Sequence, residues 1–75
     1  MIDDEIFILI ADERKRILKK WGVQRHAPGK WVLILMEEIG EACQALLEHR
    51  ELDAVQELIQ AAAVITTWIE ALITE

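Results

Sequence analysis

The stretch "WVLILMEEIGEACQALL", residues 31–47, decides the fold of this chain. It contains no proline, and Gly40 is its only glycine. Apolar residues run through it without the turn residues that separate the strands of a hairpin, so the pattern is typical of a buried helix. Its only charges are Glu37, Glu38 and Glu41. The sequence therefore predicts a helix over residues 31–49 that carries three carboxylates among apolar side chains.

Two further helices are predicted on either side of this segment. Residues 3–20 form the first, and Gly22 suits the position just after its end. The loop "GVQRHAPG", residues 22–29, contains Pro28 and Gly29 as breakers. A short link at residues 50–52 leads to the third helix.

The third helix is predicted over residues 53–75. Asp53 and Gln56 fit a capping box at its start, and Glu75 ends the chain. Because the link to this helix is short, residues 31–49 and the third helix must form an antiparallel hairpin.

The composition predicts a single all-α domain over residues 1–75 that works as an oligomer. The chain has 75 residues, of which 53% are hydrophobic, and a chain of this length is marginal for burying such a core alone. The second and third helices are apolar around most of their circumference. We therefore expect their antiparallel pair to complete a four-helix bundle with a second subunit.

Charge and cysteine content exclude several classes of protein. The net charge of −6 argues against binding to nucleic acid or to an anionic membrane. The longest uncharged run, residues 58–69, is too short to span a bilayer. The acidic N-terminus is unlike a signal peptide, and Cys43, the only cysteine, cannot form an intrachain disulfide. The expected location is the cytoplasm.

The glutamates are the strongest candidates for a functional site. Glu38 and Glu41 are three residues apart and share a helix face, and Glu37 flanks Glu41. Glu57 on the third helix faces them only if the two helices are offset in register, which the sequence leaves open. A divalent cation would relieve the repulsion between such carboxylates, and oxygen ligands favour Mg²⁺ or Mn²⁺.

A solvated helix face is the alternative interpretation of the same glutamates. Its members follow a regular helical spacing and are Glu37, Glu41, Gln44 and Glu48.

Residues 37–72 resemble the MazG-type, all-α nucleoside triphosphate pyrophosphohydrolases. The pattern of that family is E-E-x-x-E on one helix and E-x-x-D on the next. Here the first element stands as Glu37-Glu38-Ile39-Gly40-Glu41 and the second as Glu57-Leu58-Ile59-Gln60. The upstream segment, with Lys20-Trp21-Gly22, Gln24 and His26, is also similar to the lead-in of small MazG-like proteins.

The resemblance implies a homodimer or homotetramer that cleaves a nucleoside triphosphate to a monophosphate and pyrophosphate, as in house-cleaning of the nucleotide pool. By position, Glu38, Glu41 and Glu57 would hold Mg²⁺ (or Mn²⁺), and Glu37 would position or deprotonate the attacking water. Gln60 stands where the family has Asp; its amide oxygen can be a ligand but brings no charge, which should weaken the binding of a second ion. The alternative is a non-catalytic oligomerisation or nucleotide-sensing module that keeps the fold.

Basic and aromatic residues near the loop are the candidates for substrate binding. Seven of the eight basic residues lie between Arg14 and Lys30, and those closest to the breakers can meet phosphates. Trp21 can stack on a base, and His26 can contact phosphate or base. The predicted substrate-binding set is Lys20, Trp21, Arg25, His26 and Lys30.

Overall fold

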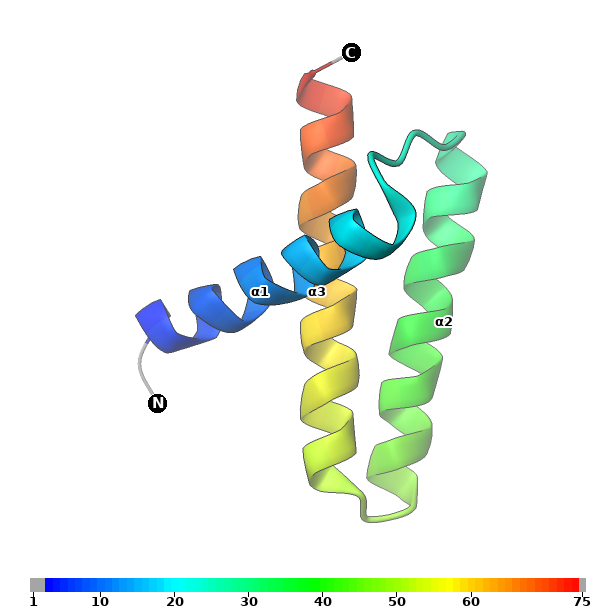
Figure 1. Cartoon of the computed structure of the whole chain (residues 1–75). Helices are drawn as coiled ribbons and strands as arrows, with labels where there is room; N and C mark the ends of the chain where they lie inside the picture. Colours follow the sequence, from blue (N-terminus) through cyan, green and yellow to red (C-terminus); the bar gives the residue numbers. More distant parts are fainter. Residues whose placement is uncertain (1–2, 75) are drawn as a thin grey trace.

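A computed structural model describes residues 3–74 as three α-helices with no strand among them. The helices are α1 (Asp3–Trp21), α2 (Pro28–Leu47) and α3 (Glu51–Ile73). α2 and α3 form an antiparallel hairpin, and α1 crosses α3 at a steep angle without packing on α2 (Figure 1). The prediction of an all-α chain whose second and third helices pair is confirmed.

The helix boundaries correct the sequence prediction at the loops. α2 begins at Pro28, earlier than expected, because a proline in the first turn needs no N–H partner and its φ is already helical. The capping box at Asp53 is wrong. The N-cap residue of α3 is Arg50 and makes no side-chain cap hydrogen bond, while Asp53 accepts a hydrogen bond from Arg50 Nη1 at 2.9 Å. The predicted final residue, Glu75, lies outside the described residues.

The interface between α2 and α3 follows a heptad-like spacing, and we refer to its positions as the seam. Steps of three and four residues mark it on both helices, which is the spacing of helices packed at a shallow angle. Most seam residues are small and buried, and Ala42, Ala45, Ala54 and Ala61 are at most 4% exposed. The seam consists of Trp31, Leu35, Glu38, Ala42 and Ala45 on α2, and of Ala54, Glu57, Ala61, Val64, Trp68 and Ala71 on α3.

Two tryptophans pack together at the end of the seam that lies away from the α2–α3 turn. Trp31 is 2% exposed and stacks on Trp68, with ring centroids 6.0 Å apart and planes 4° apart. The imidazole of His26 meets the edge of Trp31 at 4.8 Å. Burial of these large rings is the main apolar contact of the hairpin, and it ties the loop before α2 to the core.

The two sides of the hairpin differ in chemistry. Residues that follow a seam position by one lie about 100° around the helix, and because α2 and α3 are antiparallel, this rotation brings both sets to the same side. All of them are apolar, and most are exposed. This outer apolar face comprises Val32, Met36, Ile39, Cys43 and Leu46 on α2, and Val55, Leu58, Ala62, Ile65, Ile69 and Leu72 on α3.

Positions that precede the seam by one lie on the opposite side and are mostly polar. They include Glu37, Glu41, Gln60 and Thr67. α1 packs on this polar side, where Arg14 Nη2 forms an ion pair of 3.0 Å with Glu70. The single chain therefore covers its polar side in part and leaves its apolar side open.

No helix among residues 3–74 combines the length and the apolar character that a bilayer crossing requires.

Gly22 provides a direct test of the end of α1. Its φ is +74°, and its N–H donates to the carbonyl of Leu18 at 2.8 Å. Gly22→Ala should lower the free energy of unfolding by about 1 kcal/mol, because only glycine adopts this backbone without strain. Urea unfolding measures the change.

Gly29→Ala is the matched control, since a Cβ at either glycine meets no atom within 4 Å. Residue 29 lies inside α2, so alanine there should leave stability unchanged or slightly raised. Equal effects of the two substitutions would contradict the assigned helix end.

Candidate metal centre

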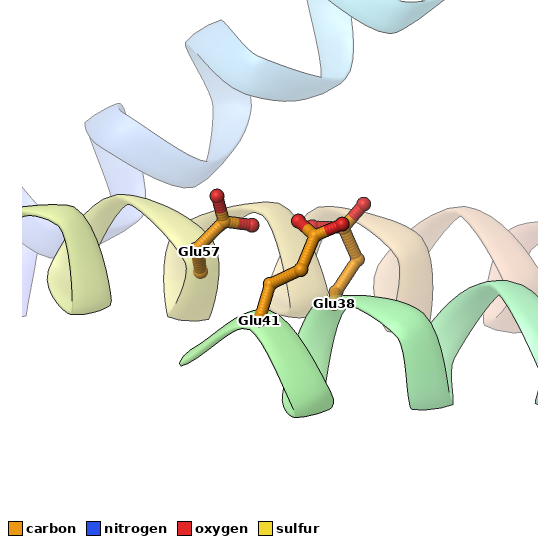
Figure 2. A group of neighbouring side chains, drawn as sticks. All are labelled: Glu38, Glu41 and Glu57. Carbon is orange, nitrogen blue, oxygen red and sulfur yellow. The ribbon is translucent and has the colours of Figure 1, made fainter. Parts of the chain in front are cut away.

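Three glutamates from two helices converge midway along the hairpin. Glu38 and Glu41 project from α2 and Glu57 from α3 (Figure 2). One carboxylate oxygen from each lies within 4.8 Å of the other two. Glu38 and Glu57 are half-buried seam residues, whereas Glu41 is exposed on the polar side. The register that the sequence left open is therefore the one that brings Glu57 opposite Glu38 and Glu41.

Seam positions for Glu38 and Glu57 explain why these groups meet. Every other seam residue is apolar, so the antiparallel packing that buries the alanines also presses two carboxylates together. Charged groups at such positions oppose packing unless they are paired or protonated. The members of the alternative solvated face, Glu37, Glu41, Gln44 and Glu48, are all exposed as that interpretation predicts, whereas Glu38 and Glu57 are half-buried.

The fourth predicted ligand, Gln60, also reaches the cluster. Its amide lies 2.8 Å from Glu38 Oε2 and 3.1 Å from Glu57 Oε2, and with Nε2 turned toward these oxygens it donates a hydrogen bond to each. Rotation of the amide by half a turn would direct Oε1 to the same place. The side chain can therefore serve either a cluster without a cation or one with a cation.

Crowding raises the pKa of all three carboxyl groups. Burial raises the pKa of Glu38, with repulsion from Glu41 and Glu37 adding to it. The pKa of Glu41 is raised by its hydrogen bond to Glu57 and by the charge of that residue. Burial and the hydrogen bond with Glu38 raise the pKa of Glu57. A group of acids that resists ionisation in this way gains from a cation placed among them.

α1 adds two residues to the surroundings of the cluster that the sequence analysis missed. Glu13 is 10% exposed, and both of its oxygens accept from Arg16 Nε, at 2.6 and 2.8 Å. The charge of Glu13 contributes to the raised pKa of Glu38, and Glu38 in turn raises the pKa of Arg16 after the dominant contributions of Glu13. Only the crossing of α1 over α3, which no local pattern encodes, places them there.

The predicted substrate-binding residues lie away from the carboxylates within one chain. Lys30 is in the first turn of α2, eight residues before Glu38, which corresponds to about 12 Å along the helix axis. Lys20 Nζ lies 5.2 Å from the Trp21 ring centroid, and Trp21 is 65% exposed. The imidazole of His26 is against Trp31, and its Nε2 is buried with no hydrogen-bond partner among the described residues.

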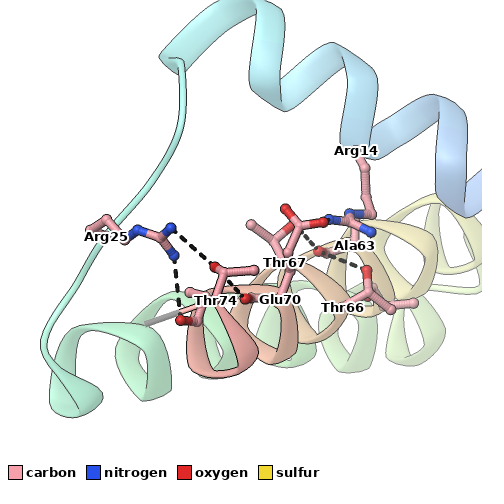
Figure 3. Close-up of polar contacts among 9 residues, drawn as sticks. Arg14, Arg25, Ala63, Thr66, Thr67, Glu70 and Thr74 are labelled. Carbon is pink, nitrogen blue, oxygen red and sulfur yellow. Dashed lines mark hydrogen bonds and ion pairs between the residues drawn. The ribbon is translucent and has the colours of Figure 1, made fainter.

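Arg25 binds the end of α3. Its guanidinium donates to the carbonyl of Ala71 at 3.4 Å and to Thr74 Oγ1 at 3.1 Å (Figure 3). Glu37, the predicted base, is exposed beside Glu38 and is not one of the three converging carboxylates.

The residues of this cluster are of the kind that holds a hard divalent ion. Oxygen ligands on opposite sides of Mg²⁺ are about 4.2 Å apart, and around Ca²⁺ about 4.8 Å. One oxygen from each glutamate lies within 4.8 Å of the other two, so the three side chains are near enough to share one ion of either size. The donor set is carboxylate and amide oxygen, which suits these ions and disfavours zinc.

Comparisons with known proteins add no relative. No protein-family model, curated protein or solved structure matches the chain. The resemblance to MazG-type enzymes therefore stays a prediction from the motif residues.

The raised pKa values predict a stability change on neutralising Glu38. Without divalent cations at neutral pH, Glu38→Gln should raise the melting temperature, because it removes a charge that the folded state disfavours. The folded-state pKa lies above the ordinary value of 4.5, so the penalty is complete above the folded pKa and disappears below the unfolded one. The gain should therefore shrink as pH falls toward 4.5, as measured by circular dichroism melts.

Glu48→Gln is a control of opposite sign. Hydrogen bonds from Gln44 and Arg50 lower the pKa of Glu48, so its charge stabilises the fold slightly and its removal should lower the melting temperature. A Glu38→Gln variant that melts below the wild type at pH 7 would show that the carboxylates do not repel one another in the fold.

Proposed function

We propose that this chain is a Mg²⁺-dependent nucleoside triphosphate pyrophosphohydrolase, with Mn²⁺ as an alternative ion. The observation that carries the proposal is the convergence of Glu38, Glu41 and Glu57 from two helices onto one point. These are the positions that the E-E-x-x-E and E-x-x-D pattern assigns to metal ligands. The role that follows is removal of surplus or non-canonical nucleotides.

The reaction adds water across one phosphoanhydride bond. The oxygen of water bonds to the α-phosphorus, the bond from that phosphorus to the bridging oxygen breaks, and pyrophosphate leaves with the electron pair. Glu38, Glu41 and Glu57 would hold the Mg²⁺, which would neutralise charge on the triphosphate and lower the pKa of the attacking water. Glu37, exposed beside Glu38, is the residue we assign to accept the proton from that water.

A second copy of the chain is part of the proposal. The accessible surface of 5655 Å² exceeds by about 1,000 Å² that expected of a folded monomer of 8.6 kDa. This excess is close to the roughly 800 Å² that each partner buries in an interface of standard size. The outer apolar face, with the heptad spacing of bundle helices, is the surface we assign to the contact.

A pyrophosphohydrolase needs residues that contact the base and the outer phosphates, and a dimer or tetramer would supply them. Within one chain, Lys30 lies about 12 Å from Glu38 along α2, and Lys20 and His26 contact the rings of Trp21 and Trp31. Since the assigned contact is on the apolar side and Glu41 is on the polar side, these residues would have to come from a subunit of the oligomer that also reaches the polar side of the hairpin.

A non-catalytic or nucleotide-sensing helical module is the second candidate function. Gln60 favours it, since the amide satisfies Glu38 and Glu57 by hydrogen bonds without any ion. A sensor would bind nucleotide with metal and release no pyrophosphate. A non-catalytic oligomerisation module would bind neither nucleotide nor metal ion.

Replacing a carboxylate should separate these candidates. With ribo- and deoxyribonucleoside triphosphates and Mg²⁺ or Mn²⁺, we expect the wild type to release pyrophosphate. Glu41→Gln should lower the rate by 100-fold or more, an order of magnitude typical for a lost catalytic group, while the circular dichroism spectrum stays unchanged. Glu48→Gln, an equivalent change on the same helix outside the cluster, should keep the wild-type rate.

Metal binding can be measured without turnover. Titration with Mn²⁺ should stabilise the wild type, and Gln60→Asp should tighten the binding because it adds a fourth carboxylate. Indifference of wild-type stability to Mn²⁺ up to millimolar concentration would sink the metal assignment, whereas binding without pyrophosphate release would leave a sensor.

Oligomerisation gives an independent prediction. Ile65→Glu places a charge in the middle of the outer apolar face, where the residue is 40% exposed in the single chain, and should convert a dimer or tetramer to monomer in sedimentation experiments. Leu52→Glu at the hairpin turn, 86% exposed, is the control and should leave the mass unchanged. A wild-type chain that sediments as a monomer would refute the contact.

A further inference from the structure

A cavity lies between α1, the loop that follows it and the last third of α3. Its volume is about 320 Å³, which is at the lower end of the range of small-molecule pockets. The glutamate cluster is not part of its wall. From Glu57 to Thr67, which lines the cavity, α3 rises by about 15 Å, so the two features are separate.

The wall of the cavity combines apolar and cationic side chains. Leu18 of α1 and Val23 of the loop contribute apolar surface, and Arg14, Lys15 and Arg25 contribute positive charge. Among the described residues that line the cavity, Glu70 is the single acid, so the net charge of these residues is +2. A local excess of positive charge on a chain of net charge −6 favours an anionic ligand.

The contacts of these cations leave charge for a ligand. Arg14 is paired with Glu70 at 3.0 Å. Within residues 3–74, Arg25 donates only to neutral oxygens, those of Ala71 and Thr74, and Lys15 makes no ion pair. Figure 3 shows Arg25 reaching α3 from the loop and Arg14 reaching it from α1, at two separate places.

We propose that this cavity binds a small organic anion, an apolar body that carries one phosphate or carboxylate group. The body lies against Leu18 and Val23, and the anionic group meets Lys15 and Arg25. This binding needs neither metal nor the glutamate cluster, so it is independent of the proposed pyrophosphohydrolase activity.

Amide chemical shifts in EDTA-containing buffer test the proposal with simple probes. Phenyl phosphate and benzoate combine a ring with a charge, inorganic phosphate has only the charge, and phenol has only the ring. We expect the first two to shift the amides of Gly22, Val23 and Thr67, and the other two to bind at least fivefold more weakly. Phosphate as strong as phenyl phosphate would refute a site for an apolar body.

Charge variants identify the binding groups. Lys15→Gln should weaken phenyl phosphate binding by about two- to fivefold, the effect of one exposed charge, and Arg25→Lys should retain most of the affinity. Lys19→Gln makes the same charge change on α1 outside the cavity wall and should have no effect. Equal effects at Lys15 and Lys19, or shifts confined to the outer apolar face, would overturn the assignment.

Discussion

The register of the α2–α3 seam is the constraint on which the rest of the structure depends. Small alanines at Ala42, Ala45, Ala54 and Ala61 let the helices approach closely, and the stacked tryptophans lock the other end. Because helical side chains have a fixed spacing, this one register also determines which side chains of α2 and α3 lie opposite each other along the rest of the hairpin. Glu38 and Glu57 meet because they occupy seam positions, and a shift of one turn would separate them.

The seam also divides the surface into two chemistries. The residues that follow a seam position by one are apolar on both helices, and most of those that precede a seam position by one are polar. α1 covers part of the polar side, and its Glu13–Arg16 pair lies beside the carboxylates. The polar side therefore holds the glutamate cluster and the cationic cavity, and the outer apolar face stays uncovered in the single chain. In the proposed oligomer, the ligand sites would lie on one side of the chain and the assigned subunit contact on the other.

Sequence patterns predicted the helices well and the long-range contacts poorly. The uninterrupted apolar stretch around Glu37 and the glycine at residue 22 located α2 and the end of α1, since both depend on local propensity. The start of α3 was misplaced because Arg50 provides the N-cap without a side-chain signal. The contacts of Glu13 and Arg25 could not be found, because they depend on how α1 and the loop pack on α3, and this is decided by the whole core.

Gln60 affects both the stability of the glutamate cluster and the ion binding proposed for it. An aspartate at this position would add a further charge to acids whose pKa values are already raised by crowding, and a chain of this size has little stability to offset that repulsion. The amide carries no charge and, with Nε2 turned toward the cluster, donates to Glu38 and Glu57. In the proposed metal site, rotation of the amide would present Oε1 to the ion instead. Glutamine in place of the expected aspartate would therefore lower the affinity for an ion and raise the stability of the hairpin without one.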